Sequence, residues 1–107
     1  MRGPYTPRME IPADIPVNRR TEYEGIVGLL MESAEPGDAC AAAAADAIAR
    51  GSLLEGHLWR AMHFASRVEL RALFETHFPE LAAGNTKDMR WKKYLYKRLC
   101  GWPGFHG

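Results

Sequence analysis

The sequence predicts an all-α fold: a small helical bundle of about five helices with an extended N-terminal arm. Apolar residues recur at three- and four-residue steps in several stretches, which is the period of an amphipathic helix. Serine or threonine is followed three residues later by glutamate at the start of three of these stretches, the pattern of a capping box. No stretch shows the pattern of a strand. Together these observations favour short helices joined by short connections.

The first 20 residues are predicted to form the arm, and residues 21–107 a single helical domain. The arm has four prolines, which exclude a regular helix or a central strand: Pro4, Pro7, Pro12 and Pro16. Its apolar residues include Ile11 and Ile15, so we expect it to lie across the domain and pack loosely.

Helix boundaries are predicted from capping and breaking residues. Capping boxes begin three helices, at Thr21/Glu24, Ser52/Glu55 and Ser66/Glu69. Asp38 is expected to cap a helix over residues 39–50, which Gly51 would end. Pro79 begins a brief helical turn that reaches Ala83, and Gly84-Asn85 breaks the chain before the last helix.

The last helix is predicted to run from Thr86 to Cys100 and has two unlike faces. Trp91, Tyr94, Leu95 and Leu99 share an apolar face, and Gly101 is expected in a left-handed conformation after its end. The formal charges over residues 87–98 sum to +5, whereas the whole chain carries +1. The remaining residues are therefore slightly acidic, and this charge asymmetry is the main functional signal in the composition.

Length and composition bound the class of protein. The chain has 107 residues, 47% hydrophobic and 25% charged, which are ordinary values for one globular domain. No apolar run reaches the roughly 18 residues of a membrane span, and the amino terminus lacks the apolar stretch of a secretory signal. Cys40 and Cys100 are 60 positions apart and are expected to be reduced thiols. A cytoplasmic protein is therefore expected.

Several segments together resemble one known family. They are GHLW at 56–59, SRVEL at 66–70, HFPELAA at 77–83, DMRWKKYLYK at 88–97 and Leu99-Cys100. In order and spacing they resemble NifQ, the nitrogen-fixation family implicated in supplying molybdenum for the iron–molybdenum cofactor of nitrogenase. The resemblance covers roughly residues 22–100 and implies the same helical domain and a role in molybdenum supply.

The resemblance also implies a cysteine cluster that these residues do not contain. NifQ proteins continue past the basic helix into a C-x4-C-x2-C-x5-C segment that holds an iron–sulfur or molybdenum–iron–sulfur centre. Cys100 matches a family cysteine upstream of that segment, and Ser52 stands where the family tends to have another. The chain therefore resembles a truncated NifQ. We expect no cofactor within the single chain, and molybdenum or an iron–sulfur cluster only if a partner supplies ligands.

The candidate binding residues lie on the basic helix. Its charged and aromatic side chains are candidates for contacting a protein partner or an anion such as molybdate: Arg90, Trp91, Lys92, Lys93, Tyr96 and Lys97. A solvated face that only keeps the helix soluble is the alternative interpretation. Cys100 and His57 are weak candidate metal ligands, and a structural role is expected for His57 and His77.

No catalytic residues are expected. The sequence has no glycine-rich phosphate loop, no nucleophile elbow and no HExxH zinc motif. The leading hypothesis is therefore a NifQ-like accessory protein that acts through contacts with a nitrogenase-cofactor assembly or molybdenum-handling protein. The alternatives are a small helical adaptor or regulator unrelated to nitrogen fixation, and an anion or nucleic-acid binder that uses the basic helix.

Overall fold

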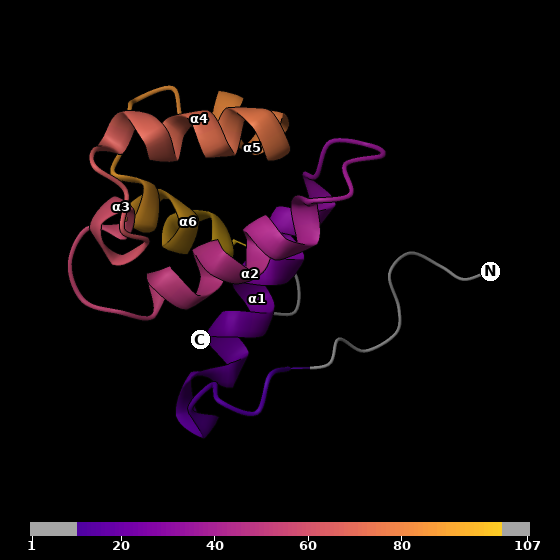
Figure 1. Cartoon of the computed structure of the whole chain (residues 1–107), viewed down its shortest axis with the longest axis vertical. Coiled ribbons are helices and arrows are strands. Elements are labelled where there is room, and N and C mark those ends of the chain that lie inside the picture. Colours follow the sequence, from indigo (N-terminus) through magenta and orange to yellow (C-terminus); the bar gives the residue numbers. More distant parts are fainter. Residues whose placement is uncertain (1–10, 102–107) are drawn as a thin grey trace.

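The computed structural model describes residues 11–101, and every regular element in that range is helical (Figure 1). A 3-10 turn leads into the first of six α-helices. The elements are η1 (Val17–Arg19), α1 (Arg20–Glu32), α2 (Ala41–Ser52), α3 (Leu58–Ala61), α4 (Arg67–His77), α5 (Pro79–Ala83) and α6 (Trp91–Cys100). The all-α prediction is confirmed. Residues 1–10 of the predicted arm, and residues 102–107, lie outside the described residues.

The second half of the predicted arm follows the surface of the helical domain. The Ile15 amide donates to the Pro12 carbonyl at 3.1 Å, and the Ile15 side chain is buried. This anchor holds the chain against the domain immediately before η1.

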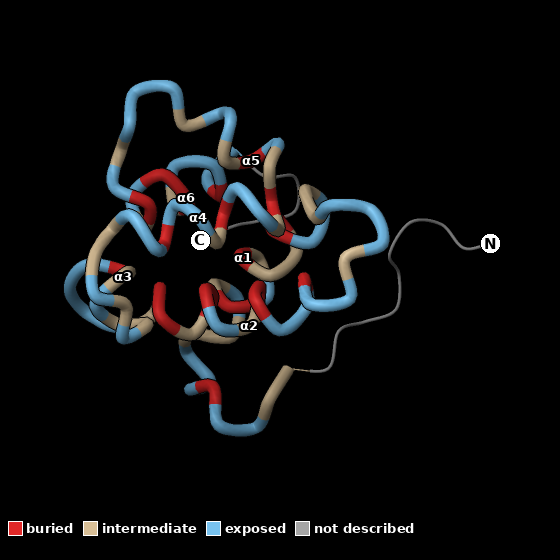
Figure 2. Tube along the Cα trace, turned by 45° about the horizontal axis from the view of Figure 1, so that its top comes forward, coloured by how far each residue is buried: buried red, intermediate tan, exposed pale blue. Residues whose placement is uncertain are grey.

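Helix α6 contributes four buried side chains to the core. Its predicted apolar face is confirmed, because Trp91, Tyr94, Leu95 and Leu99 are all buried. Trp91 stacks on Phe74 of α4, and the Tyr94 hydroxyl donates to a carbonyl of α5. All six α-helices contribute buried residues (Figure 2). Side chains of α6 therefore join parts of the chain that lie far apart in sequence.

The predicted start of α6 is wrong by one turn and a half. The helix begins at Trp91 and not at Thr86, because Asp88 has a φ of +51° and Arg90 has extended backbone angles. Neither conformation belongs to an α-helix. Gly101 has a φ of −95°, so the expected left-handed residue after the helix is absent at that position.

Two of the three predicted capping boxes are also wrong. Thr21 lies inside α1, which continues directly from η1. Ser52 is the last residue of α2 and is buried, and its hydroxyl donates to the Ile48 carbonyl at 2.8 Å. Gly51 therefore lies within α2, where an added Cβ would come within 2.9 Å of Leu58 of α3. The glycine permits this close approach of α3 to α2.

Ser66 is the N-cap of α4 as predicted, but the reciprocal bonds of a capping box between Ser66 and Glu69 are not formed. The short helix after it is confirmed. The Ser66 hydroxyl accepts from the Val68 amide at 3.3 Å, and Glu69 accepts from the Ala65 amide at 2.6 Å. Helix α5 begins at Pro79 and ends at Ala83 as predicted. Asp38 accepts from the Cys40 amide, so it orders the turn before α2, although that helix begins at Ala41 and not at Ala39.

His77 has the structural role that the sequence analysis expected. Its Nδ1 lies 2.5 Å from Oδ2 of Asp38, and its carbonyl accepts from the Glu35 amide at 2.9 Å. The imidazole, together with the Cys40 amide, holds the pKa of the Asp38 carboxyl below its ordinary value. These contacts attach the end of α4 to the connection between α1 and α2.

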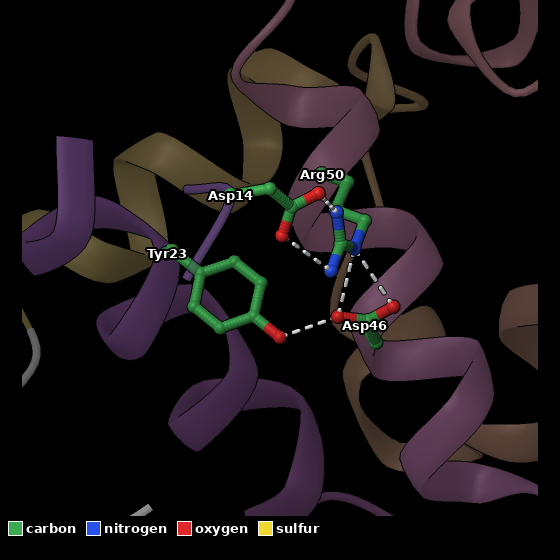
Figure 3. Close-up of polar contacts among 4 residues, drawn as sticks. All are labelled: Asp14, Tyr23, Asp46 and Arg50. Atoms are coloured by element: carbon green, nitrogen blue, oxygen red, sulfur yellow. Dashed lines mark hydrogen bonds and ion pairs between the residues drawn. The ribbon is translucent and has the colours of Figure 1, made fainter. Parts of the chain in front are cut away.

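A polar cluster joins the N-terminal segment, α1 and α2 (Figure 3). Arg50 donates to both carboxylate oxygens of Asp46, one turn earlier on α2, and to both of Asp14. The buried Tyr23 of α1 donates its hydroxyl to Asp46 at 2.5 Å. Burial, followed by the bond to Asp46, raises the pKa of Tyr23 to about 12. The phenol therefore stays a donor at physiological pH.

We expect Tyr23→Phe to lower the free energy of unfolding by about 1 kcal/mol, because it removes the hydroxyl that links α1 to Asp46. Urea denaturation monitored by circular dichroism measures the change. Asp14→Asn, which removes a partner of Arg50 that is mostly exposed, should cost less. An equal or larger loss for Asp14→Asn would contradict this ranking.

Candidate basic cleft

A cleft of about 670 Å³ opens beside the first turn of α6. Four parts of the chain form it: the segment around α3, the first turns of α4, the connection into α6, and the first turns of α6 itself. We call it the basic cleft. Its lining residues are Gly56, His57, Leu58, Trp59, Arg67, Leu70, Asp88, Arg90, Trp91, Lys92, Lys93 and Tyr96.

The floor of the basic cleft belongs to the hydrophobic core. The Trp91 ring lies 4.3 Å from the Phe74 ring with an interplanar angle of 12°, and the Arg67 guanidinium lies 5.9 Å from the centroid of the indole. Trp91 is only 4% exposed, and within residues 11–101 its indole nitrogen has no hydrogen-bond partner. This packing fixes the start of α6 and with it the position of the neighbouring basic residues.

The connection into α6 is held in place by ion pairs with α4. Asp88 accepts from Arg71 at 2.8 Å and pairs with Arg67 at 2.9 Å. Arg67 also donates to the Met89 carbonyl at 2.7 Å, and the Asn85 side chain bridges the Met89 amide and carbonyl. Arg67, and to a lesser extent Arg71, hold the pKa of the Asp88 carboxyl below its ordinary value.

On the opposite side of the cleft, two side chains of α6 donate hydrogen bonds to backbone carbonyls of the segment before α3. Lys92 donates from Nζ to the Leu54 carbonyl at 2.5 Å, and the Tyr96 hydroxyl donates to the Ser52 carbonyl at 3.4 Å. Burial raises the pKa of Tyr96, with nearby Glu22 acting in the same direction. His57 stacks on Trp59, with 6.1 Å between the ring centroids.

The charge of the basic cleft is strongly positive. Four cations and one carboxylate line it, and that carboxylate, Asp88, is already paired. Arg67 and Lys92 are engaged with protein groups. Arg90 and Lys93 are exposed and form no salt bridge with any described residue. These two side chains are therefore available to negatively charged groups from outside.

Five of the six predicted binding residues meet at this cleft, namely Arg90, Trp91, Lys92, Lys93 and Tyr96. Lys97 does not line it. It lies in a second, smaller groove of about 410 Å³ together with Lys87 and Arg98. The predicted binding residues are therefore divided between two hollows, because the segment around α3 reaches only the beginning of α6.

The weak metal candidates are not brought together by the cleft. His57 lines it, whereas Cys100 is exposed at the far end of α6 and is not among the lining residues. Over the described part of the chain, no three His, Cys, Asp or Glu side chains are grouped so that they could hold a metal ion. The arrangement is suited to binding anionic groups.

The selection of candidate binding residues missed three charged or aromatic residues that line the cleft. Arg67, Trp59 and Asp88 face it from α4, α3 and the connection before α6. All three occur within segments that carry the family resemblance, SRVEL, GHLW and DMRWKK. That coincidence is the signal that could have identified them.

The family model described as NifQ matches residues 6–106. The chain belongs to the NifQ family. The resemblance on which we based the expectation of a role in nitrogen fixation is therefore confirmed.

Several NifQ proteins are similar to this chain. The NifQ homolog of Sinorhizobium fredii is 50% identical over 78 residues, which cover 73% of this chain and 34% of that protein. Azotobacter vinelandii NifQ is 39% identical over 95 residues, covering 89% and 49% respectively. Rhodobacter capsulatus NifQ is 31% identical over 107 residues, covering 98% and 59%.

The chain thus spans between about a third and three fifths of the length of these NifQ relatives. No solved structure matches it significantly. Within residues 11–101, none of the helices has the length and apolar character needed to cross a membrane.

We expect Asp88→Asn to loosen the connection into α6 while preserving its backbone, because asparagine tolerates the left-handed conformation at this position. Without the carboxylate, Arg67 and Arg71 lose their ion pair, and amide exchange in residues 85–90 should become faster. Hydrogen exchange followed by NMR measures this.

The same variant tests a dependence on pH. The pKa of Asp88 is lower in the folded protein than its ordinary value of 3.8, so the ionised carboxylate stabilises the fold above that value. This contribution is lost as the pH falls through the folded pKa. The stability of the wild-type chain should therefore fall more steeply below about pH 4 than that of Asp88→Asn. Parallel acid curves would contradict the assignment.

Proposed function

We propose that this chain is a NifQ accessory protein that helps to supply molybdenum for the iron–molybdenum cofactor of nitrogenase. In this proposal it acts by docking to a cofactor-assembly or molybdenum-handling protein and does not itself make or break bonds. Family membership supports the biological context. The basic cleft supports the mode of action.

The observation that carries the docking role is the combination of free charge and fixed geometry in this cleft. Arg90 and Lys93 are exposed, yet they flank Trp91, which is locked into the core by Phe74. Because the backbone beneath these cations is already fixed, binding has to order only their side chains. A solvated face that only confers solubility would need no such cleft.

Molybdenum is the cargo in this proposal. Iron–sulfur clusters are ordinarily held by four thiolates, whereas these 107 residues include two cysteines, Cys40 and Cys100. Ligands for a cluster must then come from outside these residues, either from the docked protein or from further chain. Docking would place such ligands next to the α6 surface.

We expect the purified chain to bind at least one nitrogenase-cofactor assembly protein in an anaerobic binding assay with immobilised chain. The double variant Arg90→Glu/Lys93→Glu should weaken that binding by about tenfold or more, because it reverses both free charges of the cleft. Lys87→Glu/Lys97→Glu makes the same change of charge in the second groove and is the matched control. Circular dichroism should show unchanged helicity in both.

Absence of binding to every cofactor-assembly protein would overturn the proposed role. Equal loss in both double variants would remove the basic cleft from it. Strongly salt-dependent binding of DNA that exceeds binding to these proteins would favour the nucleic-acid alternative.

Metal analysis tests the absence of a resident cluster. We expect the anaerobically purified 107-residue chain to contain far less than one iron or molybdenum per molecule, because it offers too few thiolates. Inductively coupled plasma mass spectrometry measures both metals. Stoichiometric iron or molybdenum would contradict the proposal that the chain works without its own cluster.

A further inference from the structure

We infer that the basic cleft receives an acidic peptide segment that carries one bulky apolar side chain between its carboxylates. The inference rests on the proposed docking function and specifies the partner's chemistry. Three features of the cleft support it: its size, the bonding of two of its cations to other groups of the protein, and its aromatic surface.

The size of the cleft favours a peptide over a small inorganic anion. Its volume of about 670 Å³ lies in the range of roughly 300–1,000 Å³ that is typical of pockets for larger organic ligands. A single tetrahedral oxyanion would fill only a small part of this space. It would leave most of the aromatic lining exposed to water.

Two of the four cations in the cleft are already bonded to protein groups, and this also favours a peptide over a small inorganic anion. Compact dianions are held best by several donors that converge on one point. Here Arg67 is occupied by Asp88 and the Met89 carbonyl, and Lys92 by the Leu54 carbonyl. Arg90 and Lys93 remain, and each of them can pair with one carboxylate of a peptide.

The start of α6 adds a position for a carboxylate. No side chain caps the start of α6, because the residue before the helix, Arg90, has donors but no acceptor. The amides of that turn therefore lack an intrahelical partner and favour a negatively charged acceptor. A glutamate or aspartate side chain of the docked segment would complete the turn, next to the charges of Arg90 and Lys93.

The aromatic side of the cleft suits an apolar anchor. Leu58, Leu70 and Trp91 are nearly fully buried and form a closed floor, whereas Trp59 is only half-buried and offers ring surface. A phenylalanine or leucine side chain placed against Trp59 would cover this surface. Interfaces commonly combine such a central apolar contact with charged groups at the rim.

The probe for this inference is a synthetic peptide with two glutamates on each side of a single phenylalanine. We expect it to bind the full chain and to shift the indole NMR signals of Trp59 and Trp91. The peptide with serine in place of phenylalanine should bind at least about fivefold more weakly, and the peptide with lysine in place of glutamate should not bind.

Protein variants locate the binding. Arg90→Glu/Lys93→Glu should weaken peptide binding by about tenfold or more, whereas the matched Lys87→Glu/Lys97→Glu should change it by less than about twofold. Equal weakening in both would show unspecific attraction and overturn the inference. Failure of the peptide to bind would overturn it as well.

Two further outcomes separate this inference from related ideas. If sulfate or molybdate alone produced the same indole shifts and the peptide bound no better than its serine form, the ligand would be an inorganic oxyanion and the inference would be wrong. If cofactor-assembly proteins bound through the cleft while the peptide did not, the docking function would stand and the acidic-segment mode would fall.

Discussion

The stacking of Trp91 on Phe74 is the contact on which the architecture around the cleft depends. It joins the first residue of α6 to the middle of α4, and both residues are almost fully buried. Because Trp91 must face the core, its neighbours in sequence are displaced toward solvent. Arg90 and Lys93 therefore emerge beside the indole, on the edge of the cleft. A core contact thus sets the position of the charges that we assign to binding.

The helix faces and much of the charge distribution could be predicted from the sequence. Trp91, Tyr94, Leu95 and Leu99 are buried as the helical period requires, because burying apolar area is the main favourable term in folding. The charge excess over residues 87–98 also needs no structure. What these patterns determine is which side of a helix is buried, and this depends on residue type and spacing alone.

Helix ends and the division of the basic face could not be predicted, because they depend on contacts distant in sequence. Thr86 has the side chain of a capping residue, yet α6 begins five residues later. The reason is Asp88, which pairs with Arg67 and Arg71 of α4 and adopts a left-handed backbone conformation. Ion pairs spanning 17 and 21 positions leave no trace in a local pattern. Lys97 was likewise grouped with Lys93, although the walls that create the cleft reach only the first turns of α6.

The four cations of the cleft have two different roles. Two of them bond to the protein and stabilise the fold, and the other two are left for binding. Arg67 and Lys92 lose part of their hydration but gain backbone carbonyls as acceptors, so they hold the two walls together. Had all four cations been paired, no charge would have remained for a partner. Two cations therefore bond the walls of the cleft, and two exposed cations, Arg90 and Lys93, are left for the carboxylates of the proposed peptide.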